Sequence, residues 1–448
     1  MAQPLSVSNK EIWQITYPII FGNLAQTLIV LVNTIFLGHV GKVELGAAMM
    51  AGLYYLVFTT ILQGFTIGIQ ILVARRLGEG ELKRIGPIFE HGLFFSLFLG
   101  AVMLALMHFG TRGILGGIVH SPNIYTAALQ FIDFRQWGIL FVSMNFMFRS
   151  LYIGLSNTKI ITYTTVAMAV VNIFFDYSLI FGHFGFPEMG VAGAGLSSVI
   201  AEATACIVFF LHTFLKLPYK KYSLFSFQAF EWPLLGNVLR ISLPTMFQRF
   251  ISFGSWFLFF AMIEHLGEEP MAISGIVRSI FMLSTLSAFA YGACANTVSS
   301  RLIGAGLINE VAPTLRQILK ISLLTLLPIL FLLVIFPKQV ASLYTDDIAM
   351  AARSVPALYV VYLSSILIAI SMVYFEFVSG TGNTHIALYI ETGALVFYII
   401  YVYLATEVFH LAIHWVWTAD WIYTSLRFLG SIIFLKFYPW KTQKHFSK

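Results

Sequence analysis

The chain has 448 residues, of which 58% are hydrophobic, 16% aromatic and only 10% charged. A soluble domain carries about 25% charged residues, so these charges are too few to cover a soluble protein of this length. Two cysteines exclude a disulfide scaffold. The net charge of +6 does not indicate a nucleic-acid binder, because the basic residues lie in short loops between apolar runs. These runs are too long for barrel strands of about 10 residues, so the composition predicts an all-α integral membrane protein.

Twelve apolar segments, separated by polar or Gly- and Pro-bearing breaks, predict twelve transmembrane helices. The longest connection, 217–230, lies at mid-chain and contains Lys220 and Lys221. We interpret it as a cytoplasmic linker between an N-lobe (1–216) and a C-lobe (231–448). The predicted helices cover 12–37, 45–76, 87–109, 123–154, 159–182, 190–216, 231–264, 270–302, 313–336, 349–380, 385–410 and 412–438.

The distribution of Lys and Arg predicts the orientation, because cytoplasmic loops of membrane proteins are enriched in these residues. With the N-terminus inside, only Lys42, Arg112, Lys338 and Arg353 fall in outer loops. Fourteen fall in inner loops and tails, which predicts that both termini are cytoplasmic and that the helix number is even. The inner set is Lys10, Arg75, Arg76, Lys83, Arg84, Lys159, Lys216, Lys220, Lys221, Arg301, Lys436, Lys441, Lys444 and Lys448.

A single shift of the sequence, which places Pro18 on Pro244, aligns its two halves without a gap over most of six helices. We call this alignment the repeat register. The matched residues are mainly Gly, Pro and Asn at breaks, where the backbone geometry is specific. Six helices per half is an even number, so this repeat register predicts two pseudo-symmetric six-helix lobes related by an axis along the membrane normal. Such lobes favour a transporter. The other matches include His39 with His265, Arg75 with Arg301, Gly80 with Gly306, and Asn157 with Asn383.

An ionisable residue within a membrane helix is costly and is by default a functional candidate. Asp176 lies in such a helix, and Asn172 lies four residues earlier on the same face. A carboxylate beside an amide carbonyl is a pair of hard oxygen ligands. It can coordinate Na⁺, or the carboxylate can carry a proton. A purely structural Asp is the alternative.

Other polar residues within the predicted helices are weaker candidates. Pro18 interrupts the first helix and permits a bend there, and Gln26 and Asn33 follow on roughly one face. The charged side chains of Glu202, Arg249 and Arg278 either form buried ion pairs or line a polar cavity.

Several sequence segments, taken together in their order along the chain, resemble the multidrug and toxic compound extrusion (MATE) family over residues 12–438. The first helix, YPIIFGNLAQTLIVLVNTIFLGHVG, is similar to the opening segment of that family, and so are ILVARRLGEGE, GLSNTKI, DYSLIFG and GVAGAGLSSVIAE. In the second half SSRLIGAG and SGTGNTHIAL match the equivalent places. The resemblance implies an efflux antiporter of prokaryotic type, driven by Na⁺ or H⁺, whose two lobes alternate between inward- and outward-open states.

The resemblance also implies a cation site in the N-lobe. Its Asn and Asp correspond to Asn172 and Asp176, and its hydroxyl to Ser198. The sequence departs from the family at Asn33, where the family often has Asp, so one of two carboxylates is missing. Asp176 could then bind the ion with neutral oxygens or carry a proton, and Glu202 is a candidate for the second carboxylate.

The remaining expectations concern substrate, partners and rival functions. The resemblance implies export of small cationic or amphipathic organic compounds, with Gln26, Arg249 and Arg278 as candidate cavity residues. It also implies no cofactor, a location in the inner membrane and a monomer. A lipid-linked oligosaccharide flippase of the same superfamily is the alternative function, favoured by Arg249 and Arg278. A membrane-embedded enzyme is disfavoured, because the sequence contains no metal triad or nucleophile–base motif.

Overall fold

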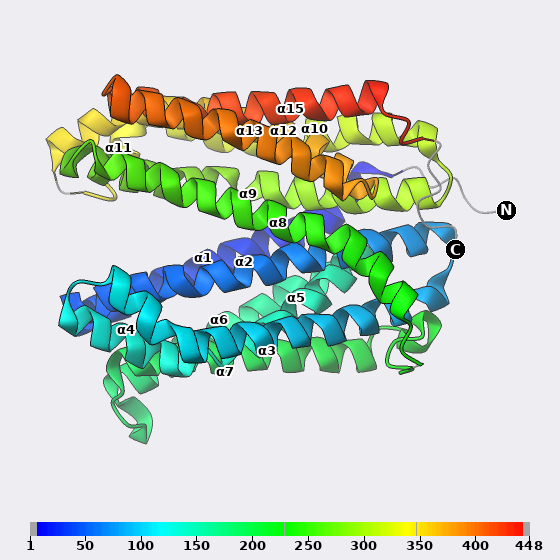
Figure 1. The fold of residues 1–448 in the computed structure, drawn as a ribbon, viewed down its shortest axis with the longest axis horizontal. Helices are drawn as coiled ribbons and strands as arrows, with labels where there is room; N and C mark the ends of the chain where they lie inside the picture. The colour runs from blue at the N-terminus through cyan, green and yellow to red at the C-terminus, as the bar shows by residue number, and fades with distance from the viewer. Residues whose placement is uncertain (1–6, 228, 346, 442–448) are drawn as a thin grey trace. The chain divides into compact units, whose positions relative to one another are not determined.

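The computed structural model describes residues 7–227, 229–345 and 347–441, and its regular elements are helices (Figure 1). The candidates Lys444 and Lys448 lie outside the described residues. In the first half of the chain the elements are α1 (Asn9–Val40), α2 (Lys42–Glu79), η1 (Leu82–Arg84), α3 (Ile85–Ile118), α4 (Pro122–Arg135), α5 (Gly138–Gly154), α6 (Lys159–Phe181), η2 (His183–Gly185), α7 (Gly190–Leu215) and η3 (Tyr219–Tyr222). In the second half they are α8 (Trp232–Glu264), α9 (Glu268–Gly304), α10 (Ile308–Ile335), α11 (Pro337–Ala341), α12 (Ile348–Gly380), α13 (Thr384–Tyr403), η4 (Leu404–Val408), α14 (Ile413–Val416) and α15 (Ala419–Phe437).

Ten helices of the described chain are long and apolar enough to cross a membrane. The other two expected spans are interrupted. The span predicted at 123–154 is divided between α4 and α5, and the span predicted at 412–438 between α14 and α15. The twelve-helix all-α fold is therefore consistent with the structure. The two interruptions were not predicted, because neither contains a proline and apolar content alone does not mark them.

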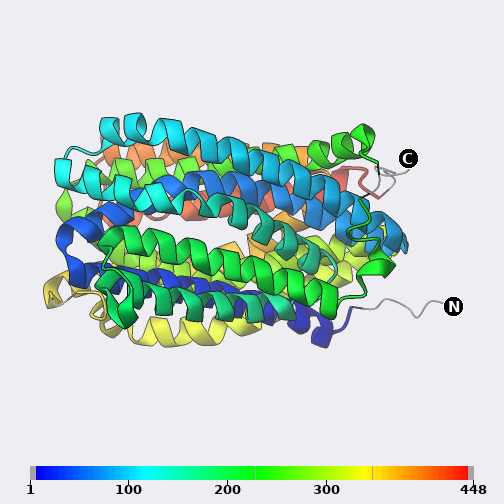
Figure 2. The same cartoon turned by 90° about the horizontal axis from the view of Figure 1, so that it is seen from below.

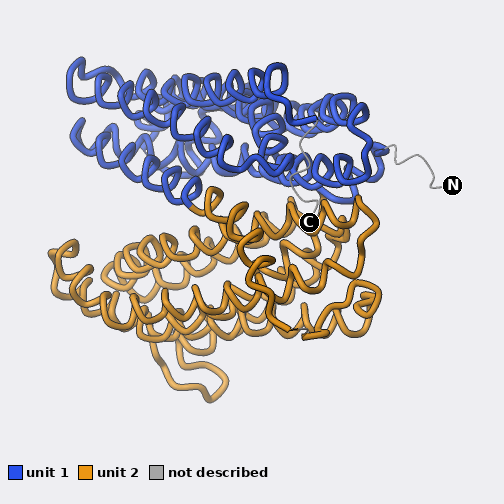
Figure 3. The backbone as a smooth tube through the Cα atoms, turned by 45° about the vertical axis from the view of Figure 1, so that its right-hand side comes forward, with its two compact units in different colours: residues 1–16, 247–448 blue, residues 17–246 orange. Residues whose placement is uncertain are grey.

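The chain divides into two compact units (Figure 3). Unit 2 consists of residues 17–246, and unit 1 consists of residues 1–16 and 247–448. The first turns of α1 and of α8 thus belong to a different unit from the rest of each helix. The predicted lobes, 1–216 and 231–448, which assign α1 and α8 whole, remain a prediction.

Within unit 2, long helices lie side by side along most of their length (Figure 2). The main pairs are α6 with α7, α2 with α5, and α4 with α7. The first part of α8 packs closely on α2, because Gly64 has no side chain: a Cβ there would lie 2.7 Å from the Met246 Cα atom. The Thr245 hydroxyl donates to the Gly64 carbonyl at 2.7 Å. An apolar cluster containing Ala47, Leu62 and Phe131 fills the core of this unit.

Unit 1 is built around α9 and α12, which pack along each other and against α10 and α15. Its core is an apolar cluster that includes Phe259, Tyr398 and Trp417. The short first segment of the chain is fixed to this unit by an ion pair between Glu11 and Arg301, at 2.6 Å.

Two helix ends show the repeat at the level of backbone geometry. Gly80 follows α2 with φ +75°, and its N–H donates to carbonyls of the last turn. Gly306, which the repeat register places on Gly80, follows α9 with the same φ of +75°. Glycine adopts this left-handed conformation without the steric cost that a Cβ would bring. Pro18 and Pro244, which the repeat register places on each other, both lie inside helices, α1 and α8.

Candidate functional site

Asp176 and Asn172 lie on α6, one turn apart, and both side chains are buried within unit 2. Asp176 is 0% exposed. A spacing of four residues places both side chains on one face of the helix. Both side chains contact the same two residues, one on α1 and one on α7. Among the ion pairs of the described residues none involves Asp176. Its carboxylate is therefore surrounded by neutral polar groups.

The hydroxyl group beside the pair belongs to Ser197 on α7. Ser197 is buried, its Oγ donates to Asp176 Oδ1, and Asn172 Nδ2 donates to Ser197 Oγ at 3.4 Å. The resemblance in sequence predicts Ser198 for this role, but the Ser198 hydroxyl donates to the Ala194 carbonyl at 3.0 Å. Neighbouring residues on a helix point about 100° apart. An error of one position therefore turns the hydroxyl away from α6.

Asn33 of α1 completes the cluster. In the amide orientation that suits its neighbours, its Nδ2 donates to the Ile29 carbonyl at 3.1 Å, to Asn172 Oδ1 at 2.9 Å and to Asp176 Oδ2. Three helices, α1, α6 and α7, thus supply the four side chains of what we call the Asp176 cluster: Asn33, Asn172, Asp176 and Ser197. A cation would meet oxygen atoms here, but Asn33 would have to turn its amide oxygen inward to become a ligand.

Glu202 does not join the Asp176 cluster. Its two carboxylate oxygens accept from Arg135, at 2.5 and 2.8 Å, and the Arg135 guanidinium lies over the Tyr55 ring at 3.8 Å. The side chains of this ion pair are 13% and 12% exposed. Of the two sequence interpretations of Glu202, the structure supports the buried ion pair. Because Arg135 neutralises it, Glu202 is not available as a second carboxylate beside Asp176.

Of the candidate cavity residues, Arg249 and Arg278 belong to unit 1 and Gln26 belongs to unit 2. Arg249 pairs with Glu376 at 3.4 Å in unit 1, and Asn296 donates to the same carboxylate at 3.1 Å. Arg278 lies against aromatic rings instead of an acid, 5.5 Å from the centre of the Phe260 ring. Gln26 is exposed on α1. Pro18 interrupts α1 without ending it, and its carbonyl accepts from the Thr162 hydroxyl at 3.2 Å.

Comparison with known proteins adds the family. The profile of the family described as MatE matches residues 18–178 and again residues 244–404. The second match begins on Pro244 where the first begins on Pro18, and its last residue, 404, is residue 178 moved by the same shift. Together the two matches cover more than half of the chain. The chain belongs to the MatE family. The resemblance inferred from the sequence is thereby confirmed, and so is the register of the internal repeat.

Curated relatives of this MatE protein carry multidrug-resistance names. The chain is 25% identical to the probable multidrug resistance protein NorM of Thermotoga maritima over 389 residues, which is 84% of this chain and 80% of the relative. It is 23% identical to the multidrug resistance protein PmpM of Pseudomonas aeruginosa over 350 residues, 77% of this chain and 72% of the relative.

Solved MATE-type structures share the fold. A MATE transporter of Vibrio cholerae superposes with a TM-score of 0.88 at 18% identity, covering 97% of this chain and 98% of that one. A MOP superfamily transporter from Pyrococcus furiosus superposes with a TM-score of 0.86 at 19% identity, covering 95% and 93%. The predicted all-α membrane fold with two lobes is thus confirmed.

The repeat of this MatE protein does not repeat the Asp176 cluster. In the repeat register Asn33, Asn172 and Asp176 fall on three residues that all lie in the apolar core of unit 1, namely Phe259, Tyr398 and Val402. The Phe259 and Tyr398 rings lie 5.8 Å apart. One fold therefore carries a polar cluster in one half and an aromatic cluster in the equivalent place of the other.

Unit 1 instead holds a different polar cluster that the sequence analysis missed. Glu391 of α13 is buried and accepts from the Ser252 hydroxyl at 2.6 Å and from the Tyr423 hydroxyl at 2.7 Å. Arg427 lies 3.8 Å from its other oxygen and donates to the Tyr423 hydroxyl at 2.8 Å. The rule that singled out Asp176, an acid within an apolar helix, applies equally to Glu391 and would have found it.

Among the described residues no group of three or more His, Cys, Asp and Glu side chains could hold a metal ion. The oxygen-rich Asp176 cluster contains a single carboxylate. Such a set can take up a proton, or bind a monovalent cation with neutral oxygens.

Proposed function

We propose that this MatE protein is a secondary efflux antiporter, which exports small cationic or amphipathic organic compounds in exchange for Na⁺ or H⁺. The single observation that carries the proposal is the Asp176 cluster, a buried carboxylate within membrane helices with neutral polar partners from three helices. Family membership and the multidrug-resistance names of the relatives support the class of substrate.

The coupling follows from the charge of Asp176. Exchange requires that cation and substrate bind in a mutually unfavourable way. With a proton or Na⁺ bound, the carboxylate is neutralised and is tolerated in a low-dielectric, closed site. With neither bound, its charge is costly there and favours a state that admits water or a cationic substrate. Asn33 replaces the second acid of the family, so Asp176 would bear the coupling charge of unit 2 alone.

Alternating access of two lobes in a cytoplasmic membrane is part of the same proposal, with both termini in the cytoplasm and a monomeric protein. The alternative, a lipid-linked oligosaccharide flippase, relied on Arg249 and Arg278 as free cations. Since Arg249 is paired with Glu376, that alternative has less support than the antiporter.

The test compares Asp176→Asn with Asp133→Asn in liposomes loaded with a fluorescent organic cation. Asp133 is an exposed acid of α4 in the same unit, so the control makes the same chemical change outside the cluster. Imposed Na⁺ gradients at constant pH, and pH gradients without Na⁺, identify the coupling ion. We expect Asp176→Asn to insert and fold, but to reduce gradient-driven efflux to the level of protein-free liposomes, whereas Asp133→Asn stays active.

A second variant, Asn33→Asp, restores the charge that the family pattern has at this position. We expect it to tighten cation binding or to change the ion preference, because a second carboxylate adds both charge and a ligand oxygen beside Asp176. Full coupled transport by Asp176→Asn would refute the assignment and place the coupling charge elsewhere, with Glu391 the next residue to test.

A further inference from the structure

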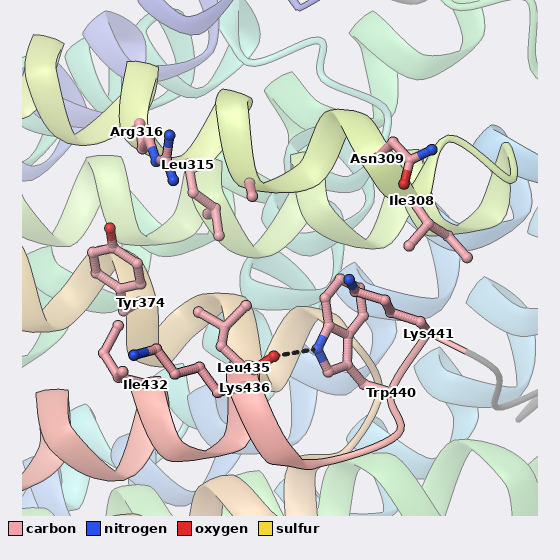
Figure 4. Close-up of a pocket in the computed structure, with 11 residues that line it drawn as sticks. Ile308, Asn309, Leu315, Arg316, Tyr374, Ile432, Leu435, Lys436, Trp440 and Lys441 are labelled. Carbon is pink, nitrogen blue, oxygen red and sulfur yellow. Dashed lines mark hydrogen bonds between the residues drawn. The ribbon is translucent and has the colours of Figure 1, made fainter.

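A cavity of about 320 Å³ lies within unit 1, between α10, α12 and the end of α15 (Figure 4). Its volume falls at the lower end of the range for ligand pockets, about 300–1,000 Å³. Residues of α10 line it at a spacing of three to four, from Ile308 to Arg316, so one face of that helix forms the wall. The opposite wall is the last two turns of α15 with Trp440 and Lys441.

The polar lining of this cavity is basic. Arg316, Lys436 and Lys441 line it, and none of the eleven lining residues is acidic. In the part of the chain that the structure describes, none of these three cations forms an ion pair. The one acid of α10, Glu310, does not line the cavity. Arg316, Lys436 and Lys441 are exposed to solvent, and their charges around one hollow give it a positive potential that favours an anionic ligand.

Apart from Asn309, the rest of the lining is apolar or aromatic. Trp440 is buried, and its indole N–H donates to the Leu435 carbonyl at 3.2 Å, which fixes the ring against the end of α15. Ile432 and Leu435 continue the apolar wall (Figure 4). Figure 4 also shows the Tyr374 hydroxyl at the end of the cavity where Arg316 lies. A free inorganic anion would use the cations but leave the apolar wall without a partner.

The place of the cavity in the membrane fits an amphiphile. It lies where α10 begins and α15 ends, beside the aromatic pair Tyr438 and Trp440. Aromatic residues of this kind gather at the membrane–water interface. The charge distribution of the loops predicts that this end faces the cytoplasm, and basic pockets between transmembrane helices on that side bind the headgroups of anionic lipids.

We propose that this cavity is a binding site for an anionic phospholipid. The phosphodiester and its polar headgroup contact Arg316, Lys436 and the Tyr374 hydroxyl, and the first carbons of the acyl chains lie against Ile432 and Leu435. Lys441, whose ammonium lies 5.7 Å from the centre of the Trp440 ring, adds charge at the opening. This inference is independent of the transported substrate and of the coupling ion.

The test uses Trp440 as an internal probe. The full chain is reconstituted in phosphatidylcholine vesicles with increasing mole fractions of phosphatidylglycerol brominated on its acyl chains, and in parallel with brominated phosphatidylcholine. The part of the tryptophan quenching that disappears in Trp440→Phe reports lipid in the cavity. We expect half-quenching at much lower mole fractions of the anionic lipid than of the zwitterionic lipid.

The double variant Arg316→Gln with Lys436→Gln should shift half-quenching about 25-fold, because each basic residue near the surface contributes about fivefold. The matched control, Arg112→Gln with Lys338→Gln, removes the same charge at the predicted outer loops and should leave the curve unchanged. Mass spectrometry of the phosphatidylglycerol that copurifies with each protein gives a second measurement that does not need the Trp440 variant.

Three results would overturn the proposal. Equal quenching by the two brominated lipids would exclude recognition of the headgroup. An equal shift of the half-quenching mole fraction in both double variants would show that the effect comes from general surface charge and not from this cavity. Recovery of fluorescence on adding inorganic phosphate, but not chloride at the same ionic strength, would identify a site for free phosphate instead of a lipid.

Discussion

The ion pair of Arg135 and Glu202 leads to a prediction about stability. Both side chains are largely buried, and the guanidinium makes two hydrogen bonds to the carboxylate and a third, at 3.0 Å, to the Tyr55 hydroxyl. Glu202→Gln would leave Arg135 buried without its counter-ion. Breaking a buried pair in this way costs about 3–5 kcal/mol. The neutral amide retains one acceptor oxygen, so we expect a cost of about 3 kcal/mol, at the lower end of that range.

The magnitude translates into a measurable melting shift. For domains of about 150–250 residues, 1 kcal/mol changes Tm by about 2–4 °C, so Glu202→Gln should lower Tm by about 6–12 °C. The natural cysteines supply the assay, because Cys206 and Cys294 are both free and buried. A dye that becomes fluorescent on reacting with thiols therefore reports unfolding, and Cys206 lies on the same helix as Glu202.

Two control variants test whether the loss of stability in Glu202→Gln comes from leaving a buried charge without its partner. Glu269→Gln removes the acid of an exposed ion pair. Glu269 and Arg353 lie 2.5 Å apart, and their side chains are 51% and 53% exposed. Because such pairs contribute less than about 1 kcal/mol to stability, the Tm of this variant should change little. Replacing Arg135 and Glu202 together by Met should recover most of the loss, because neither charge then remains buried alone. A Glu202→Gln protein that melts within about 2 °C of the wild type would refute the reasoning, since that is the least shift that about 1 kcal/mol produces.

The remaining predictions concern the Asp176 cluster and the first helix. Ser197→Ala should change the apparent affinity for the coupling ion about 10- to 150-fold, since a hydrogen bond to a charged group contributes about 1.5–3 kcal/mol. Ser198→Ala should leave this affinity unchanged. Titrations of efflux against ion concentration measure both variants, and equal effects would contradict the geometry. Pro18→Ala should leave folding largely intact but impair transport, because it restores a helical hydrogen bond and stiffens α1. If Pro18→Ala shows normal efflux rates at normal expression, Pro18 does not act as a hinge in transport.

Helices and repeat were predictable because they depend on features that a linear sequence displays. Apolar length sets the helices, and α12, predicted at 349–380, runs from Ile348 to Gly380. Glycine and proline at one fixed displacement indicated the internal repeat, which the two family matches confirm. The interruption between α4 and α5, at residues 136–137, escaped prediction because these two residues include neither glycine nor proline. At Gly138, the first residue of α5, a Cβ would meet the side chains of Arg135 and Glu202, so the glycine leaves room for the ion pair directly after the break.

Of the five candidate cation ligands named from the sequence, three lie together in the structure, whereas Ser198 and Glu202 have other partners. Asn33, Asn172 and Asp176 were singled out, and the structure brings all three together. The choice between Ser197 and Ser198 depends on the rotation of α7 about its axis, and a run of small residues around two adjacent serines does not fix that rotation. The partner of Glu202 is Arg135, 67 residues earlier, and no local pattern indicates such a pairing.

The division of the chain into units has a consequence for biosynthesis. Unit 2 is continuous, so it is complete once residue 246 has left the ribosome, whereas unit 1 needs residues from both ends. The side chain of Asn9 accepts from Gln317, which is 308 residues further along the chain. At about 5–20 residues per second, the first turn of α1 therefore waits roughly 15–60 seconds for this partner. Unit 2 is complete 71 residues before Gln317 is made. For about the last 4–14 seconds of that interval, unit 2 is therefore present in full while the start of α1 still lacks its partner residues in unit 1.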